Sequence, residues 1–280
     1  MSVKKEANGR RSVAIEVEVP GTPEDVWQAI ASGPGVSSWF VPTEIDGRVG
    51  GTIKVSFGPG KESVAQVTAW DPPRRMAKES PGMRPSSPPM ATEWIVEGRA
   101  GGTCVVRVVH SLFAATDDWD DQLSGTESGW PGFFRVLRLY LERFKGQVGT
   151  GVAILAPTSG SIDQVWDRLK SGLGLVGAGV GARCTAPADA PPLSGRVEWV
   201  GAGDERELLL VLDGPGPGIV RVGVHAMGPV TAVMVSLYLY GDRGPALVAR
   251  DEARWRAWMS QRFPPFGPTG APRDGAPAPD

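Results

Sequence analysis

The sequence predicts an α+β fold built twice along the chain, in which each copy is a curved antiparallel sheet wrapped on a long C-terminal helix. The 280 residues include 38 glycines and 26 prolines, which interrupt regular structure often and favour short strands joined by turns. A hydrophobic fraction of 41% with ten tryptophans indicates buried cores rather than a disordered chain. An internal repeat is the third observation, and it indicates two domains.

The repeat pairs a strand with a helix in each half of the chain. Val13-Ala14-Ile15 precedes Trp27 by the same spacing that separates Val152-Ala153-Ile154 from Trp166. Matching segments at a fixed spacing are typical of a duplicated domain. The predicted organisation is a flexible N-terminus at 1–11, a first domain at 12–146, a degenerate second domain at 151–263, and a disordered Pro/Gly/Ala-rich tail at 264–280.

The first domain is predicted to begin with a strand and a helix. Residues 12–20 alternate apolar and polar side chains, which is the period of a half-buried strand. Thr22 then offers a capping hydroxyl, and Pro23 suits the first position of a helix. The two acidic residues that follow complement the positive end of the helix dipole. A helix is therefore predicted from Pro23.

A run of strands and a long helix are predicted to complete the first domain. Pairs of glycines and prolines separate apolar stretches of strand length. The predicted strands cover 51–57, 62–70, 74–79, 92–98 and 103–112. The segment 80–91 is predicted to be a mobile loop. Gly129-Trp130-Pro131 is predicted to open a helix whose apolar side chains recur every three or four residues up to Phe144.

The second half repeats this order more weakly. Ser161 is a capping residue for its first helix, and its last helix carries Trp255, Trp258, Met259 and Phe263. Helices on one face of an antiparallel sheet bury a shared core. A strongly curved sheet around a long helix also leaves a space between them, and such a space suits a small molecule.

Charge and cysteine content exclude several classes of function. The formal charge of -2 and the pI of about 5.8 leave no basic face for nucleic acid. No apolar run approaches the roughly 18 residues of a membrane span, and the N-terminus lacks the apolar core of a signal peptide. Cys104 and Cys184 lie far apart in the sequence, as expected for a reduced, cytoplasmic protein. With only two histidines besides these cysteines, we expect no metal site and no cofactor.

Two motifs partly match known binding motifs, one for a dinucleotide and one for calcium, but their sequence context disfavours both functions. Gly172–Gly177 fits the GxGxxG pattern but follows a predicted helix, whereas a dinucleotide fingerprint must follow a strand. A flexible helix-to-strand loop is predicted instead. Asp117–Asp121 is strongly acidic but lacks the alternating ligands and the turn glycine of a calcium loop. A solvated loop is predicted there.

Several motifs of the first half resemble one known family. They are Pro23–Ile30, Ser38-Trp39-Phe40, Val67–Met76, Gly102–Val106 and Gly129–Phe134. On these motifs the first half resembles the START-like (SRPBCC) superfamily with its helix-grip fold. Within that superfamily it is most similar to the domains named after the activator of the ninety-kilodalton heat-shock chaperone ATPase. The second half resembles the fold only through its internal match and lacks the Trp-Phe pair.

Strand 103–112 and the long helix supply most candidate site residues. Period two places His110 on the face that the strand turns toward the helix. The candidate ligand-binding residues are Trp39, Phe40, Trp94, Val106, Val108, His110, Trp130, Phe133, Phe134, Leu137 and Tyr140. Ordinary core packing explains the apolar candidates equally well. His110 is the candidate catalytic acid or base, with a histidine satisfied by its neighbours as the alternative.

The resemblance implies a hydrophobic small-molecule partner and no cofactor. Relatives bind such molecules, and some polyketide aromatase/cyclases carry two such domains in one chain. The leading hypothesis is therefore a non-enzymatic binder of a hydrophobic or aromatic molecule, in a cavity between the sheet and the C-terminal helix. A polyketide cyclase or dehydratase and a chaperone-ATPase-regulating interaction module are the alternatives. A homodimer or another protein partner is an open possibility.

Overall fold

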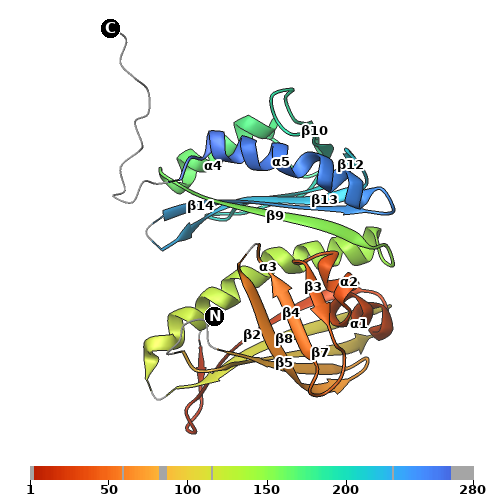
Figure 1. The fold of residues 1–280 in the computed structure, drawn as a ribbon, viewed down its shortest axis with the longest axis vertical. Coiled ribbons are helices and arrows are strands. Elements are labelled where there is room, and N and C mark those ends of the chain that lie inside the picture. Colours follow the sequence, from red (N-terminus) through yellow and green to blue (C-terminus); the bar gives the residue numbers. More distant parts are fainter. Residues whose placement is uncertain (1–2, 59, 82–86, 115, 229, 266–280) are drawn as a thin grey trace. The chain divides into compact units, whose positions relative to one another are not determined.

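The computed structural model describes residues 3–265, except residues 59, 82–86, 115 and 229. The chain divides into two compact units, Met1–Gly151 and Val152–Asp280. Each unit contains one sheet and ends in a helix that packs on it (Figure 1). The predicted α+β class is confirmed, and the two units are tandem helix-grip domains.

The first unit is built on an eight-stranded antiparallel sheet in the order β1-β2-β8-β7-β6-β5-β4-β3. Its strands are β1 (Lys4–Lys5), β2 (Arg10–Pro20), β3 (Thr43–Ile45), β4 (Thr52–Ser56), β5 (Glu62–Asp71), β6 (Arg75–Ser80), β7 (Met90–Arg99) and β8 (Thr103–Phe113). Six of these match the predicted strands. The two short strands, β1 and β3, were not predicted because two or three residues are too few to show a period.

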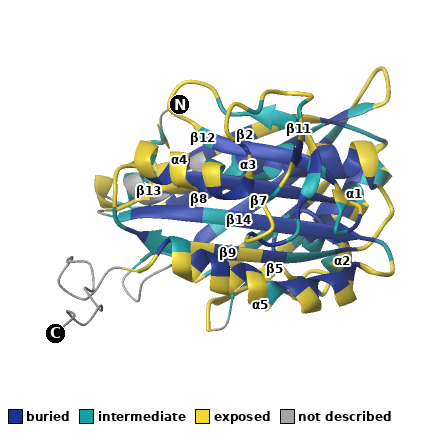
Figure 2. Cartoon of the chain, turned by 90° about the horizontal axis from the view of Figure 1, so that it is seen from above, coloured by how far each residue is buried: buried dark blue, intermediate teal, exposed yellow. Residues whose placement is uncertain are grey.

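Alternating burial gives this sheet an inner and an outer face. On β8, Cys104, Val106 and Val108 are fully buried, and the residues between them are partly exposed. This confirms the predicted inward set, and His110 continues it. Among the strands of this sheet, β2, β7 and β8 carry the most buried residues, and β7 and β8 contain dark blue segments in Figure 2. The inner face is therefore the one on which any enclosed site must lie.

Helices α1 (Pro23–Ala31) and α2 (Gly33–Ser37) follow the first long strand. The side chain of Thr22 accepts a hydrogen bond from the backbone N–H of Asp25 at 3.2 Å, and the Asp25 carboxylate accepts one from the Thr22 N–H at 3.1 Å. This capping box satisfies two donors that the helix itself leaves unpaired. The predicted helix start at Pro23 is confirmed.

The long helix α3 (Asp120–Arg143) begins earlier than predicted. A 3-10 turn, η1 (Asp117–Trp119), leads into it, and Pro131 lies inside the helix rather than at its start. The prediction placed the start at Gly129-Trp130-Pro131 because proline favours a first turn. The acidic segment before the helix overrides that preference, because its carboxylates lie at the positive end of the helix dipole.

An ion-pair cluster joins the acidic segment to the N-terminal strands. Lys5 Nζ lies 2.9 Å from Asp117 and 2.8 Å from Asp120, and the buried Arg11 lies 2.6 and 2.7 Å from the same two carboxylates. Two expectations are thereby wrong. Asp117–Asp121 is not a loop, since it forms η1 and the start of α3. Residues 4–5 and 10–11 are not an irregular extension either, since they belong to the paired strands β1 and β2.

Two other predicted flexible segments lie partly outside the described residues. The loop predicted at 80–91 is shorter than expected, because β6 extends to Ser80 and β7 begins at Met90. Residues 82–86 within it are not described. Most of the predicted tail, residues 266–280, also lies outside the described residues.

The second unit has a six-stranded sheet in the order β10-β11-β12-β13-β14-β9. Its elements are β9 (Gly149–Thr158), α4 (Ile162–Leu173), β10 (Arg183–Thr185), β11 (Ser194–Val200), β12 (Arg206–Gly214), β13 (Gly218–Met227), β14 (Val230–Tyr240) and α5 (Gly244–Arg262). Trp255, Trp258 and Phe263 pack on the sheet in one core. The GxGxxG segment begins in the last turn of α4 and is a loop from Gly174 on, where the C-cap residue has φ +69° and the chain leads to β10.

Removing the α1 cap should loosen that helix. In Thr22→Ala, the backbone N–H of Asp25 loses its acceptor, at a cost of about 1 kcal/mol, or roughly fivefold in local opening. Hydrogen exchange of the α1 amides in the full chain should therefore quicken about fivefold. Thr22→Ser retains the hydroxyl and should exchange like the parent. Equal exchange in all three proteins would show that the cap does not limit opening of this helix.

Candidate ligand-binding cavity

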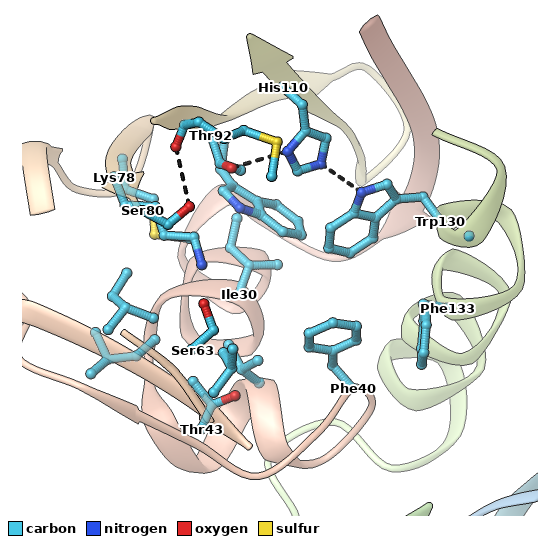
Figure 3. A pocket seen from close by; sticks show the side chains of 18 of the residues that line it. Ile30, Phe40, Thr43, Ser63, Lys78, Ser80, Thr92, His110, Trp130 and Phe133 are labelled. Carbon is cyan, nitrogen blue, oxygen red and sulfur yellow. Dashed lines mark hydrogen bonds between the residues drawn. The ribbon is translucent and has the colours of Figure 1, made fainter. Parts of the chain in front are cut away.

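A cavity of about 340 Å³ lies inside the first unit, between the inner face of the sheet and the helices. Figure 3 shows the side chains that surround it. The lining residues are Ile30, Val36, Trp39, Phe40, Thr43, Ile45, Ile53, Val55, Phe57, Ser63, Met76, Lys78, Ser80, Met90, Thr92, Trp94, His110, Gly125, Gly129, Trp130 and Phe133. Its size and apolar lining with a few polar groups are those of a small-molecule site.

Two glycines on α3 keep the cavity open. Gly125 and Gly129 are four residues apart, so they lie on the same side of the helix. A Cβ atom built on either one would meet nothing within 4 Å. A helix interior normally disfavours glycine by roughly 0.5–1 kcal/mol relative to alanine. Glycine at these positions leaves room where larger side chains would fill the gap between helix and sheet.

Aromatic rings form the wall of the cavity nearest α3. Trp130 stacks on Phe40 at a centroid distance of 5.4 Å and on His110 at 5.7 Å, with interplanar angles of 19° in both cases. Trp94 meets the Trp130 ring edge-on at 5.2 Å, and Phe133 meets Phe40 edge-on at 4.6 Å. These contacts fix the rings against one another and leave their remaining surfaces to face the cavity.

The structure brings six of the eleven predicted site residues to this cavity and leaves five elsewhere. Trp39, Phe40, Trp94, His110, Trp130 and Phe133 line it. Val106, Val108, Phe134, Leu137 and Tyr140 are buried but are not among the lining residues. Val106 and Val108 come before His110 on β8, and the other three lie on α3 after the last helix residue that lines the cavity, Phe133. Periodicity identifies the inward face, but it does not show where along that face the space opens.

His110 is hydrogen-bonded through both ring nitrogens. The indole Nε1 of Trp130 lies 2.7 Å from His110 Nε2, and Thr92 Oγ1 lies 3.0 Å from His110 Nδ1 (Figure 3). Because an indole N–H can only donate, Nε2 must be the unprotonated acceptor. The ring proton is therefore on Nδ1, which donates to the Thr92 hydroxyl. Burial, with the nearby Lys78 charge, lowers the pKa of His110 to about 4.

The low pKa of His110 predicts a loss of stability in acid. The pKa lies below the ordinary value of 6.5, so between pH 6.5 and about 4 the unfolded chain binds a proton that the folded chain does not. The free energy of unfolding should fall by about 2 kcal/mol from pH 7 to about pH 5 through this group. His110→Gln should remove that part of the decline in urea titrations.

Nuclear magnetic resonance gives the direct check of this assignment, because the chain has only two histidines. The His110 ring signal, identified by its loss in His110→Gln, should not shift between about pH 8 and pH 5. A midpoint near 6.5 would contradict the buried, doubly bonded neutral ring.

Lys78 is the charged residue of the cavity, and neither it nor the polar lining residues Thr43, Ser63, Ser80 and Thr92 were predicted from the sequence. It lies on β6 two residues after Met76, and both side chains face inward (Figure 3). Among the described residues, no protein group forms a hydrogen bond or ion pair with its ammonium group. Burial alone lowers its pKa to about 8. A signal was present in the sequence: an apolar Met76 on a half-buried strand predicts that position 78 shares its face.

Replacing Lys78 should stabilise the ligand-free protein. Lys78→Met keeps the length of the side chain and removes a desolvated charge, so the free energy of unfolding at neutral pH should rise by about 1–3 kcal/mol. Lys54→Met, on the exposed face of β4, is the matched control and should change little.

The stability gained in Lys78→Met should become smaller as the pH rises. Below about pH 8 the side chain is charged in both states, and the folded state bears the full desolvation cost. From about pH 8 to 10.5 the folded state loses its proton first, so the cost shrinks as pH rises. Urea titrations at neutral and alkaline pH would measure both effects. A Lys78→Met protein less stable than the parent at neutral pH would contradict them.

Other kinds of site find no support in the part of the chain that the structure describes. No group of three or more His, Cys, Asp or Glu side chains there is arranged to hold a metal ion. No described helix is long and apolar enough to cross a membrane. Cys104 and Cys184 are free and buried, and burial raises the pKa of both thiols.

The part of the chain that forms the cavity also matches a known protein family in sequence. Residues 20–142 match the family model described as Activator of Hsp90 ATPase homolog 1-like protein. This span runs from the end of β2 to the end of α3 and contains every residue that lines the cavity. The first unit is thus similar in sequence to the AHSA1-like proteins, over the region that the motifs of the first half indicated. No curated protein matches the chain.

Several solved structures are similar to the chain in fold. Protein MLL2253 from Mesorhizobium loti is 22% identical over 48% of this chain and 98% of its own, with a TM-score of 0.44. The Aha1 dimer from Colwellia psychrerythraea is 24% identical over 48% and 98%, with a TM-score of 0.41. The di-domain ARO/CYC BexL from the BE-7585A biosynthetic pathway is 14% identical over 92% and 100%, with a TM-score of 0.44. Identities this low are no guide to ligand or activity.

Proposed function

We propose that the first unit binds one apolar or aromatic small molecule in the cavity between its sheet and α3. The observation that carries the proposal is the apolar cavity of about 340 Å³ beside a wall of fixed aromatic rings. Burying an apolar ligand there releases water from both surfaces, at about 25 cal/mol per Å² of apolar area. The rings are held by one another before any ligand arrives, so little side-chain ordering opposes binding.

The titratable groups of the cavity favour binding over proton-transfer catalysis. The described lining residues include no Asp, Glu, Cys or Tyr. Both nitrogens of His110 are engaged, and its pKa is too low for it to take up a proton near neutral pH. Proton transfer would therefore fall on Lys78 without a second group to complete a cycle. We accordingly place the cyclase and chaperone-regulating alternatives behind a binder of hydrophobic molecules.

A neutral fluorescent ligand tests this proposal. N-phenyl-1-naphthylamine, which brightens in apolar surroundings, should titrate the full chain to saturation at about one molecule per chain. The blocking variant is Gly129→Leu, which places a side chain in the open space beside α3 and also favours the helix by roughly 1 kcal/mol. It should fold normally by circular dichroism and lose the saturable signal.

The matched control adds the same side chain elsewhere on the helix. Ser124 is exposed on α3 and does not line the cavity. Ser124→Leu should bind the dye like the parent. A linear, unsaturable titration of the parent would refute the proposal, and so would undiminished saturable binding by a folded Gly129→Leu protein.

A further inference from the structure

Three polar side chains form one row across the inner face of the sheet. Lys78 on β6 is the direct partner of Thr92 on β7, and Thr92 is the direct partner of His110 on β8. All three line the cavity. Directly paired residues on one face of antiparallel strands have Cβ atoms about 4.5–5.5 Å apart. The Lys78 ammonium and the Thr92 hydroxyl can therefore reach one ligand group together.

The hydrogen bonds along this row run in one direction. The Trp130 indole donates to His110 Nε2, and His110 Nδ1–H donates to Thr92 Oγ1. The Thr92 hydroxyl accepts that bond and keeps its own proton to donate onward. The chain thus ends, on the cavity side, in a hydroxyl that is polarised as a donor. The neighbouring Lys78 presents only donors as well.

The charge that the described lining residues carry is positive. Lys78 is the only described lining residue that is charged at neutral pH, since His110 is neutral and no carboxylate faces the space. Figure 3 shows the Lys78 nitrogen directed into the cavity among apolar side chains. An uncompensated ammonium in apolar surroundings repels a second cation and strongly attracts an anion, because the low local dielectric magnifies both effects.

We propose that the ligand of this cavity is an aromatic or apolar acid, whose single anionic oxygen group, such as a carboxylate or phenolate, is held by the Lys78 ammonium and the Thr92 hydroxyl. The apolar body lies against Trp130 and Phe40. This inference rests on the proposed function and narrows it from any apolar molecule to one that carries one negative charge. A hydrogen bond to a charged group contributes more than a neutral one, so the acid is selected over neutral molecules of the same shape.

A pair of ligands of nearly equal shape tests the charge. 2-Naphthoate and the neutral 2-naphthamide would each displace N-phenyl-1-naphthylamine from the full chain, and their apparent Kd values would be compared at neutral pH. The parent should bind 2-naphthoate about tenfold more tightly than 2-naphthamide. In Lys78→Met that preference should disappear, so the two naphthyl ligands should bind with nearly equal Kd values. Thr92→Val should reduce the preference in part.

The outcomes separate this inference from the binder proposal. Lys54→Met removes an exposed lysine of β4 and should leave the tenfold preference unchanged, which excludes a general effect of net charge. If the parent binds the dye but not 2-naphthoate preferentially, the anionic ligand class is wrong and the binder proposal stands. If the preference persists in a folded Lys78→Met protein, the anion is held elsewhere and the inference is overturned. If the dye itself shows no saturable site, the binder proposal has failed.

Discussion

The hydrogen bond between Trp130 and His110 links the long helix of the first unit to its sheet. It fixes the tautomer of the histidine, directs the Thr92 hydroxyl toward the cavity, and places the Trp130 ring flat against Phe40. Gly125 and Gly129 border the cavity beside it, and neither carries a side chain that would occupy the open space there. Helix α3 thus supplies both the aromatic residue Trp130 of the cavity wall and the two glycines that border the cavity.

The polarity of the cavity follows from this arrangement. A doubly bonded, neutral histidine does not compete for a proton, and its pKa of about 4 leaves the positive charge of the cavity to Lys78. A buried lysine without a counter-ion costs stability in the empty protein. The proposed anionic ligand would reduce that cost, so the residue that weakens the fold is also the one proposed to select the ligand. Strained or costly groups of this kind are typical of functional sites.

Local patterns predicted most of the fold but only part of the site. Alternation and glycine or proline breaks located six strands of the first sheet, and Thr22 with Pro23 located the start of α1. The start of α3 was missed because its acidic residues bind Lys5 and Arg11, which are more than a hundred positions away and leave no local signal. Lys78 could have been predicted to face the cavity, because it lies two residues after Met76 and therefore on the same face of β6. Which inward residues border open space depends on how the helix crosses the sheet, and periodicity does not encode that.

A crystal structure of the full chain with 2-naphthoate bound would test the central claim most directly. We expect the naphthalene rings between Phe40 and the inner face of the sheet, with the carboxylate within hydrogen-bonding distance, about 2.7–3.2 Å, of Lys78 Nζ and Thr92 Oγ1. The Trp130–His110 hydrogen bond should be unchanged. An ordered naphthoate outside the cavity, or one inside it with its carboxylate turned away from Lys78, would refute the proposed role of Lys78.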